Sequence, residues 1–366
     1  MPPGAVPTIA AAVVSVLIPL LFLYVVRRLD LYASTDHRAV ALCIGWGIAS
    51  FGIAYAVNGA ALGVLARAVV IVAVAPVAEE LVKAVVLVDQ VRRPSFTYFV
   101  DGAILGFAAG TGFAMIENLV YLLGAPAADG LGLSINRVFG ASLMHGTACA
   151  LVGVALGRWR FGRDARRAVA LAGGLAAAIV LHVAFNGWTA AVDVLSPAVR
   201  VYGAIGLGLC GVAAVAAMIV QGLHEERSWL RQALAPDVGV TEAEAGAVQR
   251  LRQVRTLLAP VEAHFGAARA AEVGDLLRLQ ARFGLKRQAA ALAPAGALKE
   301  RLEVEAAALQ RAMDEAQRAI GVYVMAYVRA VWPTADDTLW ARLDEAVAAT
   351  DDGADNLWDT LDERAQ

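Results

Sequence analysis

Charge is scarce in this sequence of 366 residues. Only 17% of the residues are Asp, Glu, Lys or Arg, whereas 59% are hydrophobic and the mean hydropathy is +0.61. This composition indicates that lipid surrounds much of the chain, and we expect the bilayer, not nucleic acid, among its partners. Up to Leu223 there are 14 Lys and Arg against 10 Asp and Glu, and the rest has 17 against 23. The two parts of the chain therefore carry opposite net charge.

Cysteine is rare as well, and several motifs of known chemistry are missing. The three cysteines, Cys43, Cys149 and Cys210, lie in apolar stretches, where a small thiol is ordinary packing material. There is no CxxC, no Cys/His spacing typical of a metal site, and no HExxH. The cysteines therefore carry no functional information.

Long apolar segments recur through the first part of the chain. A helix needs about 20 apolar residues to cross the roughly 30 Å hydrocarbon core of a bilayer, and the sequence predicts seven such spans. They cover residues 7–26, 39–57, 64–88, 98–123, 134–156, 168–190 and 201–223. The first is not expected to be a cleaved signal peptide, because Arg27 and Arg28 follow its apolar run.

Arginine in alternate loops predicts the orientation. Short loops rich in Lys and Arg stay in the cytoplasm. Ten arginines fall in the first, third and fifth loops: Arg27, Arg28, Arg38, Arg92, Arg93, Arg158, Arg160, Arg163, Arg166 and Arg167. In the fourth and sixth loops, the stretches GAPAADGLGLSIN and DVLSPAV carry only Asp129 and Asp193. We expect an integral protein of the plasma membrane with its N-terminus outside and its C-terminus in the cytoplasm.

From His224 onward the pattern changes to Arg, Glu, Ala and Leu at helical spacing, interrupted by turn signals such as APDVGV and APAG. Nothing in this tail looks catalytic. The sequence therefore predicts an all-α fold with two domains. A polytopic membrane helix bundle of about seven transmembrane helices covers residues 1–223, and a cytoplasmic α-helical domain follows over 224–366.

Ionisable residues interrupt the third predicted span in the stretch APVAEELVKAVVL, residues 75–87. A carboxylate near the middle of a spanning helix costs about 2.5–3.5 kcal/mol, so packing alone does not explain Glu79 and Glu80. Lys83 lies close enough on a helix to pair with either of them. A structural pair of Glu80 with Lys83 would leave Glu79 unexplained.

Other spans carry further polar side chains. They are Glu117, Asn118, His145, His182 and Asn186. At 1.5 Å per residue, Glu79, His145 and His182 come out about 14–21 Å from the cytoplasmic ends of their helices, so they could meet. Asp101 lies near the cytoplasmic edge, where we expect it to be solvated.

Two further features favour a polar cavity at this depth. Gly102, Gly106 and Gly110 form a ridge of small residues that permits close helix approach. Pro76 should kink or open the third span and free carbonyl groups that need polar partners. A wet pocket of this kind suits hydrolysis.

Four motifs in this order resemble those of the PrsW family of intramembrane proteases. They are Glu-Glu-x-x-Lys in EELVK, Phe-x-x-x-Glu-Asn in FAMIEN, the isolated His145, and His-x-x-x-Asn in HVAFN. The resemblance covers residues 5–223 and extends to a superfamily with the CAAX prenyl proteases and the non-catalytic Aph subunit of γ-secretase. It implies a bacterial membrane protein that cleaves peptide bonds inside or at the edge of the bilayer, in some members on an anti-sigma factor.

The resemblance also implies a set of site residues. The candidate catalytic residues are Glu79, Glu80, Glu117, His145, His182 and Asn186, with Lys83 and Asn118 in support. The CAAX enzymes have His where this chain has Glu117, which leaves the water-activating pair open.

Peptide hydrolysis needs a base for water, a donor for the oxyanion and an acid for the leaving amine. We expect Glu79 to be the base and His145 to share the proton transfer. His182 and Asn186 would face the oxyanion, while Glu80 and Lys83 hold the span. No cofactor is required by this scheme.

A zinc ion is the alternative, since Glu79, His145 and His182 form a set of ligands that a catalytic zinc could use. The lack of HExxH and the origin of these ligands on separate helices favour the metal-free scheme. Two other functions stay open. A proton-coupled transporter usually shows internal repeats, of which we find none, and a non-catalytic scaffold would not need the intact Glu-Glu-x-x-Lys. The sequence specifies neither the membrane protein or peptide that serves as substrate nor the oligomeric state.

Overall fold

The computed structural model describes residues 5–30, 35–126, 129–161, 166–191, 194–234, 240–250, 253–293 and 296–332. Every regular element in these ranges is a helix, as the predicted all-α fold requires. Two compact units are present. One comprises Met1–Trp229 with Leu285–Ala307, and the other comprises Leu230–Gly284 with Ala308–Gln366. The predicted domain boundary at residue 223 stays a prediction.

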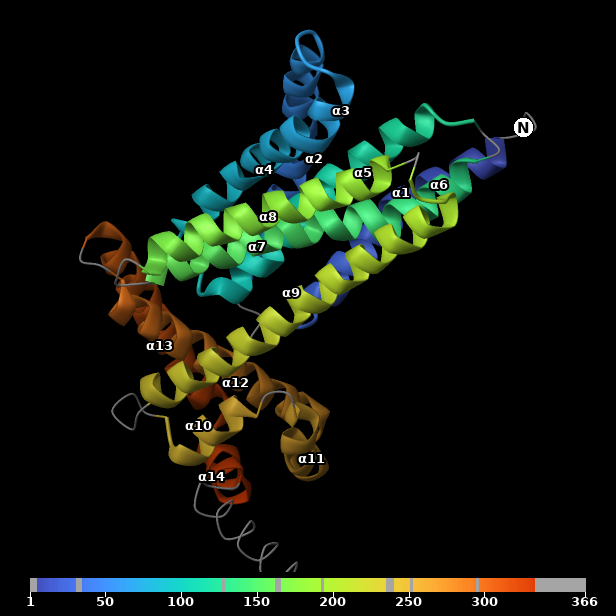
Figure 1. The fold of residues 1–366 in the computed structure, drawn as a ribbon. Coiled ribbons are helices and arrows are strands. Elements are labelled where there is room, and N and C mark those ends of the chain that lie inside the picture. The colour runs from blue at the N-terminus through green and yellow to red at the C-terminus, as the bar shows by residue number, and fades with distance from the viewer. Residues whose placement is uncertain are drawn as a thin grey trace, which may run out of the picture. The chain divides into compact units, whose positions relative to one another are not determined.

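The first part of the chain forms a series of long helices with short helical segments between them (Figure 1). They are α1 (Ala5–Arg27), α2 (His37–Leu62), α3 (Arg67–Val69), the π-helical η1 (Val70–Val74), α4 (Ala75–Val91), α5 (Phe99–Leu123), α6 (Gly130–Arg137), the π-helical η2 (Val138–Ser142), α7 (Leu143–Phe161), α8 (Arg166–Ala190) and α9 (Pro197–Ala233). The tail continues with α10 (Glu242–Gln249), α11 (Val254–Phe265), α12 (Ala267–Leu292), α13 (Ala297–Ile320) and α14 (Val322–Val331).

Six helical stretches of the described chain are long and apolar enough to cross a membrane. They are Thr8–Arg27, His37–Leu62, Phe99–Leu123, Gly130–Phe161, Arg167–Ala190 and Pro197–Glu226, and they correspond to six of the seven predicted spans. The third predicted span, over 64–88, forms α3, η1 and α4 but is not among the six. Its charged residues Glu79, Glu80 and Lys83 make it less apolar than the other spans.

Helix α5 lies at the centre of the bundle. Figure 1 shows α5, α7 and α8 side by side, and α2 packs against α5 as well. Every residue of α5 from Phe99 to Ala114 is buried. A Cβ atom at Gly102, Gly106 or Gly110 would lie 2.2 Å from a carbonyl oxygen of α7. The predicted ridge of small residues is therefore confirmed, and it brings the backbones of α5 and α7 into contact.

Asp101, in the first turn of α5, corrects one expectation. The side chain is buried, not solvated. Its carboxylate accepts hydrogen bonds from the Thr35 hydroxyl and the Thr97 backbone N–H, both at 2.6 Å. Thr35 comes from the segment before α2, a partner that helical spacing within α5 does not reveal.

The effect of Pro76 takes the form of a π-helical segment. Proline has no N–H to donate to the preceding turn, and η1 ends directly before α4, which has Pro76 in its first turn. A second π-helical segment, η2, directly precedes α7. Such segments are rare and often occur at functional sites. Here each lies shortly before a candidate site residue, Glu79 in α4 and His145 in α7.

The orientation can be tested with reporter fusions. A reporter fused after Leu223 should be active only in the cytoplasm, because the ten arginines of the odd-numbered loops hold those loops inside. A matched reporter fused after Gly124 should be active only outside. Activity outside for the fusion after Leu223 would contradict the prediction of seven crossings.

Candidate active site

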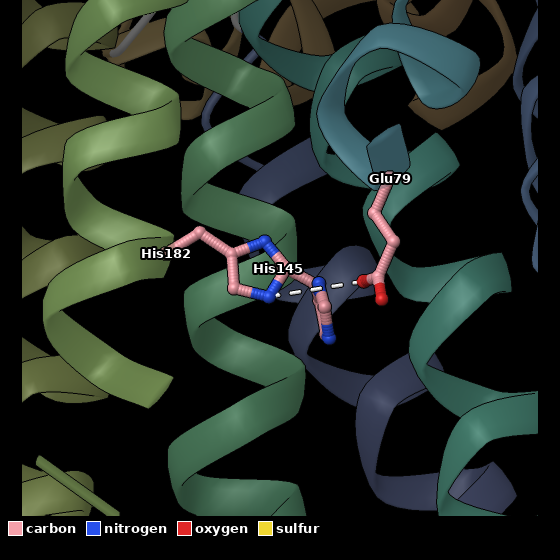
Figure 2. Close-up of side chains that lie close together, drawn as sticks. All are labelled: Glu79, His145 and His182. Carbon is pink, nitrogen blue, oxygen red and sulfur yellow. Dashed lines mark ion pairs between the residues drawn. The ribbon is translucent and has the colours of Figure 1, made fainter. Parts of the chain in front are cut away.

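Four helices contribute the polar side chains of the candidate site. Glu79, Glu80 and Lys83 lie on consecutive turns of α4, Glu117 on α5, His145 on α7 and His182 on α8. Figure 2 shows the rings of His145 and His182 turned toward the carboxylate of Glu79. The two imidazole rings are perpendicular, with their centroids 4.8 Å apart. Residues that are far apart in the sequence thus form one cluster.

Glu80 is at the centre of a fully buried ion pair. Lys83 Nζ lies 2.6 Å from Glu80 Oε1, and neither side chain is exposed. The same oxygen accepts a hydrogen bond from His182 Nδ1 at 2.8 Å. Because the carboxylate can only accept in this bond, we assign the proton of the neutral His182 ring to Nδ1, which leaves Nε2 unprotonated. Glu80 therefore balances the charge of Lys83 and orients His182.

Glu79 has no such cationic partner. Asn58 Nδ2 donates to its Oε1 at 3.2 Å, whereas Oε2 is buried without a hydrogen bond from any described residue. The nearest basic atom to Oε2 is His182 Nε2, at 3.7 Å, drawn as the dashed line in Figure 2. A free carboxylate oxygen therefore faces a free imidazole nitrogen across a short gap.

His145 has both ring nitrogens engaged. Lys83 Nζ lies 2.9 Å from Nδ1, and Glu117 Oε2 lies 2.9 Å from Nε2. Since an ammonium group only donates and a carboxylate only accepts, we assign the proton of the neutral ring to Nε2. His145 thus links the two ion pairs of the site.

The second ion pair includes a residue that the sequence reasoning did not identify. Arg137 of α6 donates to Glu117 Oε2 at 2.6 Å and to Asn118 Oδ1 at 3.0 Å. Asn118 in turn donates to the Ser142 hydroxyl at 2.9 Å. The signal was present, because Arg137 is the one charged residue within the predicted span 134–156, and a charge at that depth needs a partner. Asn58, one residue beyond a predicted span, was also missed.

The ion pairs single out Glu79 among the three acidic side chains of the cluster. Lys83 neutralises Glu80, and Arg137 neutralises Glu117. Glu79 is left with the amide of Asn58 and the neutral Nε2 face of His182. Among the three acidic side chains, it is therefore the one without a Lys or Arg partner.

Glu79, His145 and His182 form a buried group that could hold a metal ion, since one ligand atom from each lies within 4.8 Å of the others. Glu79 Oε2 and His182 Nε2 are free to bind a cation. His145 is not, because a cation would have to displace either the ammonium group of Lys83 or the carboxylate of Glu117. The three residue types suit zinc. Two of them, Glu79 and His182, have a free ligand atom, whereas both nitrogens of His145 are already hydrogen-bonded.

Asn186 forms a hydrogen bond outside this cluster. Its Nδ2 donates to the backbone oxygen of Ile71, in η1, at 2.9 Å. Within the described chain it makes no hydrogen bond to Glu79, His145 or His182. The helical spacing of the His-x-x-x-Asn motif is preserved, but the two polar groups engage different partners.

Comparison with known proteins supplies the family. Residues 35–221 match the family described as PrsW family intramembrane metalloprotease. This range contains every candidate site residue named above. No curated protein and no solved structure matches the chain. The resemblance seen in the sequence motifs is confirmed, and the chain belongs to the PrsW family of intramembrane metalloproteases, which makes it a peptidase of the membrane.

Proposed function

We propose that this protein hydrolyses peptide bonds of membrane proteins with Glu79 as the general base that activates water. The observation that carries the proposal is the free Glu79 Oε2, buried and 3.7 Å from the unprotonated His182 Nε2. A water molecule beside this pair could bridge the two atoms from one side and donate one hydrogen to each of them. Its oxygen would then be oriented for attack on a carbonyl carbon.

The proton transfers follow from this arrangement. Glu79 takes a proton from the water as the oxygen attacks the scissile carbonyl, and it then delivers that proton to the leaving amine. His182 keeps the water oriented, because Glu80 holds the other ring nitrogen at 2.8 Å. In this scheme His182 replaces His145 as the histidine next to the water.

The remaining polar side chains act as a scaffold. Lys83 links Glu80 to His145, and Glu117 links His145 to Arg137. In this network, Lys83 neutralises Glu80 and Arg137 neutralises Glu117. The network therefore keeps its geometry without leaving either carboxylate uncompensated in the membrane. Glu80, Glu117 and Lys83 are therefore proposed to position the reacting groups.

A zinc ion, if bound by Glu79, His182 and His145, would polarise the attacking water and the scissile carbonyl. We propose the metal-free scheme because His145 already has both nitrogens engaged, by Lys83 and Glu117. The family is described as one of metalloproteases, so the metal-free scheme departs from that description and has to be tested.

Chelation separates the two schemes. Exhaustive treatment of the purified protein with a chelator in detergent is expected to leave cleavage of a single-span substrate unchanged, since no step of the proposed mechanism uses a metal. A zinc peptidase treated in parallel serves as the positive control. Slow loss of activity that is restored by added zinc would contradict the metal-free scheme but keep the peptidase assignment.

We further propose that the substrate is a membrane-embedded or membrane-proximal protein, with regulatory proteins such as an anti-sigma factor as candidates. The protein would act in a bacterial plasma membrane with its C-terminal domain, 224–366, in the cytoplasm. All proposed catalytic residues precede Leu223. That domain is accordingly proposed to affect substrate choice or abundance, not the chemistry.

A further inference from the structure

The backbone oxygen of Ile71 has lost its usual partners. In an α-helix it would accept a hydrogen bond from the N–H of residue 75, but the N–H of Ala75 binds the oxygen of Val70. In a continued π-helix its partner would be residue 76, which is proline and has no N–H. The combination of η1 and Pro76 therefore leaves a carbonyl without a backbone donor.

Asn186 supplies the missing donor from a different helix. Its Nδ2 lies 2.9 Å from Ile71 O. The bond lies at an exposed position of the structure and ties α8 to η1. Asn186 lies four residues after His182 on α8, and Ile71 lies eight residues before Glu79. The bond therefore connects the two segments that carry Glu79 and His182.

We propose that Asn186 is a positioning residue that locks α8 to the π-helical break in front of Glu79, and not a donor to the oxyanion. The lock would fix the 3.7 Å separation between Glu79 Oε2 and His182 Nε2. This role rests on the proposed function as far as activity is concerned. The bond itself, and its dependence on Pro76, can be tested without any cleavage assay.

The first experiment is a double-mutant cycle between Asn186→Ala and Pro76→Ala. With Pro76 present, Asn186→Ala should lower the resistance of the protein to unfolding in detergent and reduce cleavage by about 10²-fold, the loss expected from misplacing reactive groups by roughly 1 Å. In the Pro76→Ala background, where position 76 regains an N–H, removing the Asn186 amide should cause little further loss of stability. Equal losses of stability in both backgrounds would overturn the proposal.

A reversible cross-link covers the case in which Pro76→Ala itself disturbs α4. A Cβ atom at Gly187 would lie 3.9 Å from Val72 Cγ1, so cysteines at these two positions would be neighbours, and oxidation is used to join them. In the Asn186→Ala protein, with Cys210→Ser to remove the exposed native thiol, the disulfide should restore cleavage to near the wild-type rate. Reduction should abolish that rescue.

An oxyanion donor would behave differently in each arm. Loss of such a donor would lower kcat by about 10²–10³-fold with KM unchanged, with no change in stability, no dependence on Pro76 and no rescue by the cross-link. That pattern would overturn the proposal. If the wild-type protein cleaves nothing, the proposed function fails while the stability cycle still decides whether Asn186 and Pro76 are coupled.

Discussion

Replacing Glu79 by Gln is expected to lower peptide cleavage by about 10²–10⁴-fold, because the substitution keeps size and hydrogen bonding but removes the base. The amide can still accept the bond from Asn58, so the protein should insert and fold as the wild type does. The measurement is the initial rate of cleavage of a single-span substrate by protein reconstituted in liposomes, with the folded fraction determined in the same preparation.

Asp101→Asn is the matched control for this substitution. Asp101 is a buried carboxylate of the same bundle that accepts hydrogen bonds from Thr35 and Thr97, and none of the hydrogen bonds or ion pairs described for the site residues involves it. Its amide variant should retain cleavage per folded molecule. Wild-type turnover by Glu79→Gln would remove Glu79 from the mechanism.

Replacing Lys83 by Met is expected to cost about 3–5 kcal/mol of stability, because it leaves the fully buried carboxylate of Glu80 without its cation. The ammonium group also lies 4.5 Å from the centre of the Phe113 ring and contacts His145. The resulting loss should appear as a lower resistance to unfolding in mild detergent and as a lower yield of folded protein.

The double variant Lys83→Met with Glu80→Gln is the control for this prediction. It removes both charges together, so it should recover much of the stability lost by Lys83→Met alone. Cleavage should stay impaired in the double variant, because an amide oxygen holds His182 Nδ1 more weakly than a carboxylate does and His145 loses its partner Lys83. A double variant as unstable as Lys83→Met alone would show that packing, and not the uncompensated charge, causes the loss.

The features of the fold that depend on local composition were predictable from sequence. Apolar length located the spans, and the spacing of Gly102, Gly106 and Gly110 located the close contact of α5 with α7. The span over 64–88 was predicted as well, but its polar site residues make it less apolar than the other six, and it is not among the helices apolar enough to cross a membrane. Polar side chains that form a site within a membrane necessarily lower the mean hydropathy of the helix that carries them.

The bonding of the site was less predictable, because it depends on partners from other helices. Spacing put His182 and Asn186 on one face of α8, but only the structure shows that Asn186 binds a carbonyl freed by Pro76. In the same way, the motifs identified His145 without showing that Lys83 and Glu117 occupy its two nitrogens. Side-chain partners across helices are set by packing, and a single sequence does not record them.

Glu79 is proposed to activate the water that hydrolyses a peptide bond inside or at the edge of the membrane. This proposal is tested most directly by incubating reconstituted protein with single-span substrates in ¹⁸O-labelled water and sequencing the products by mass spectrometry. We expect a cut inside or at the edge of the substrate's span, one ¹⁸O atom in the new C-terminal carboxylate, and no such product from Glu79→Gln. The same labelled product formed at the wild-type rate by Glu79→Gln, or none from the wild type across a broad set of single-span substrates, would contradict the proposal.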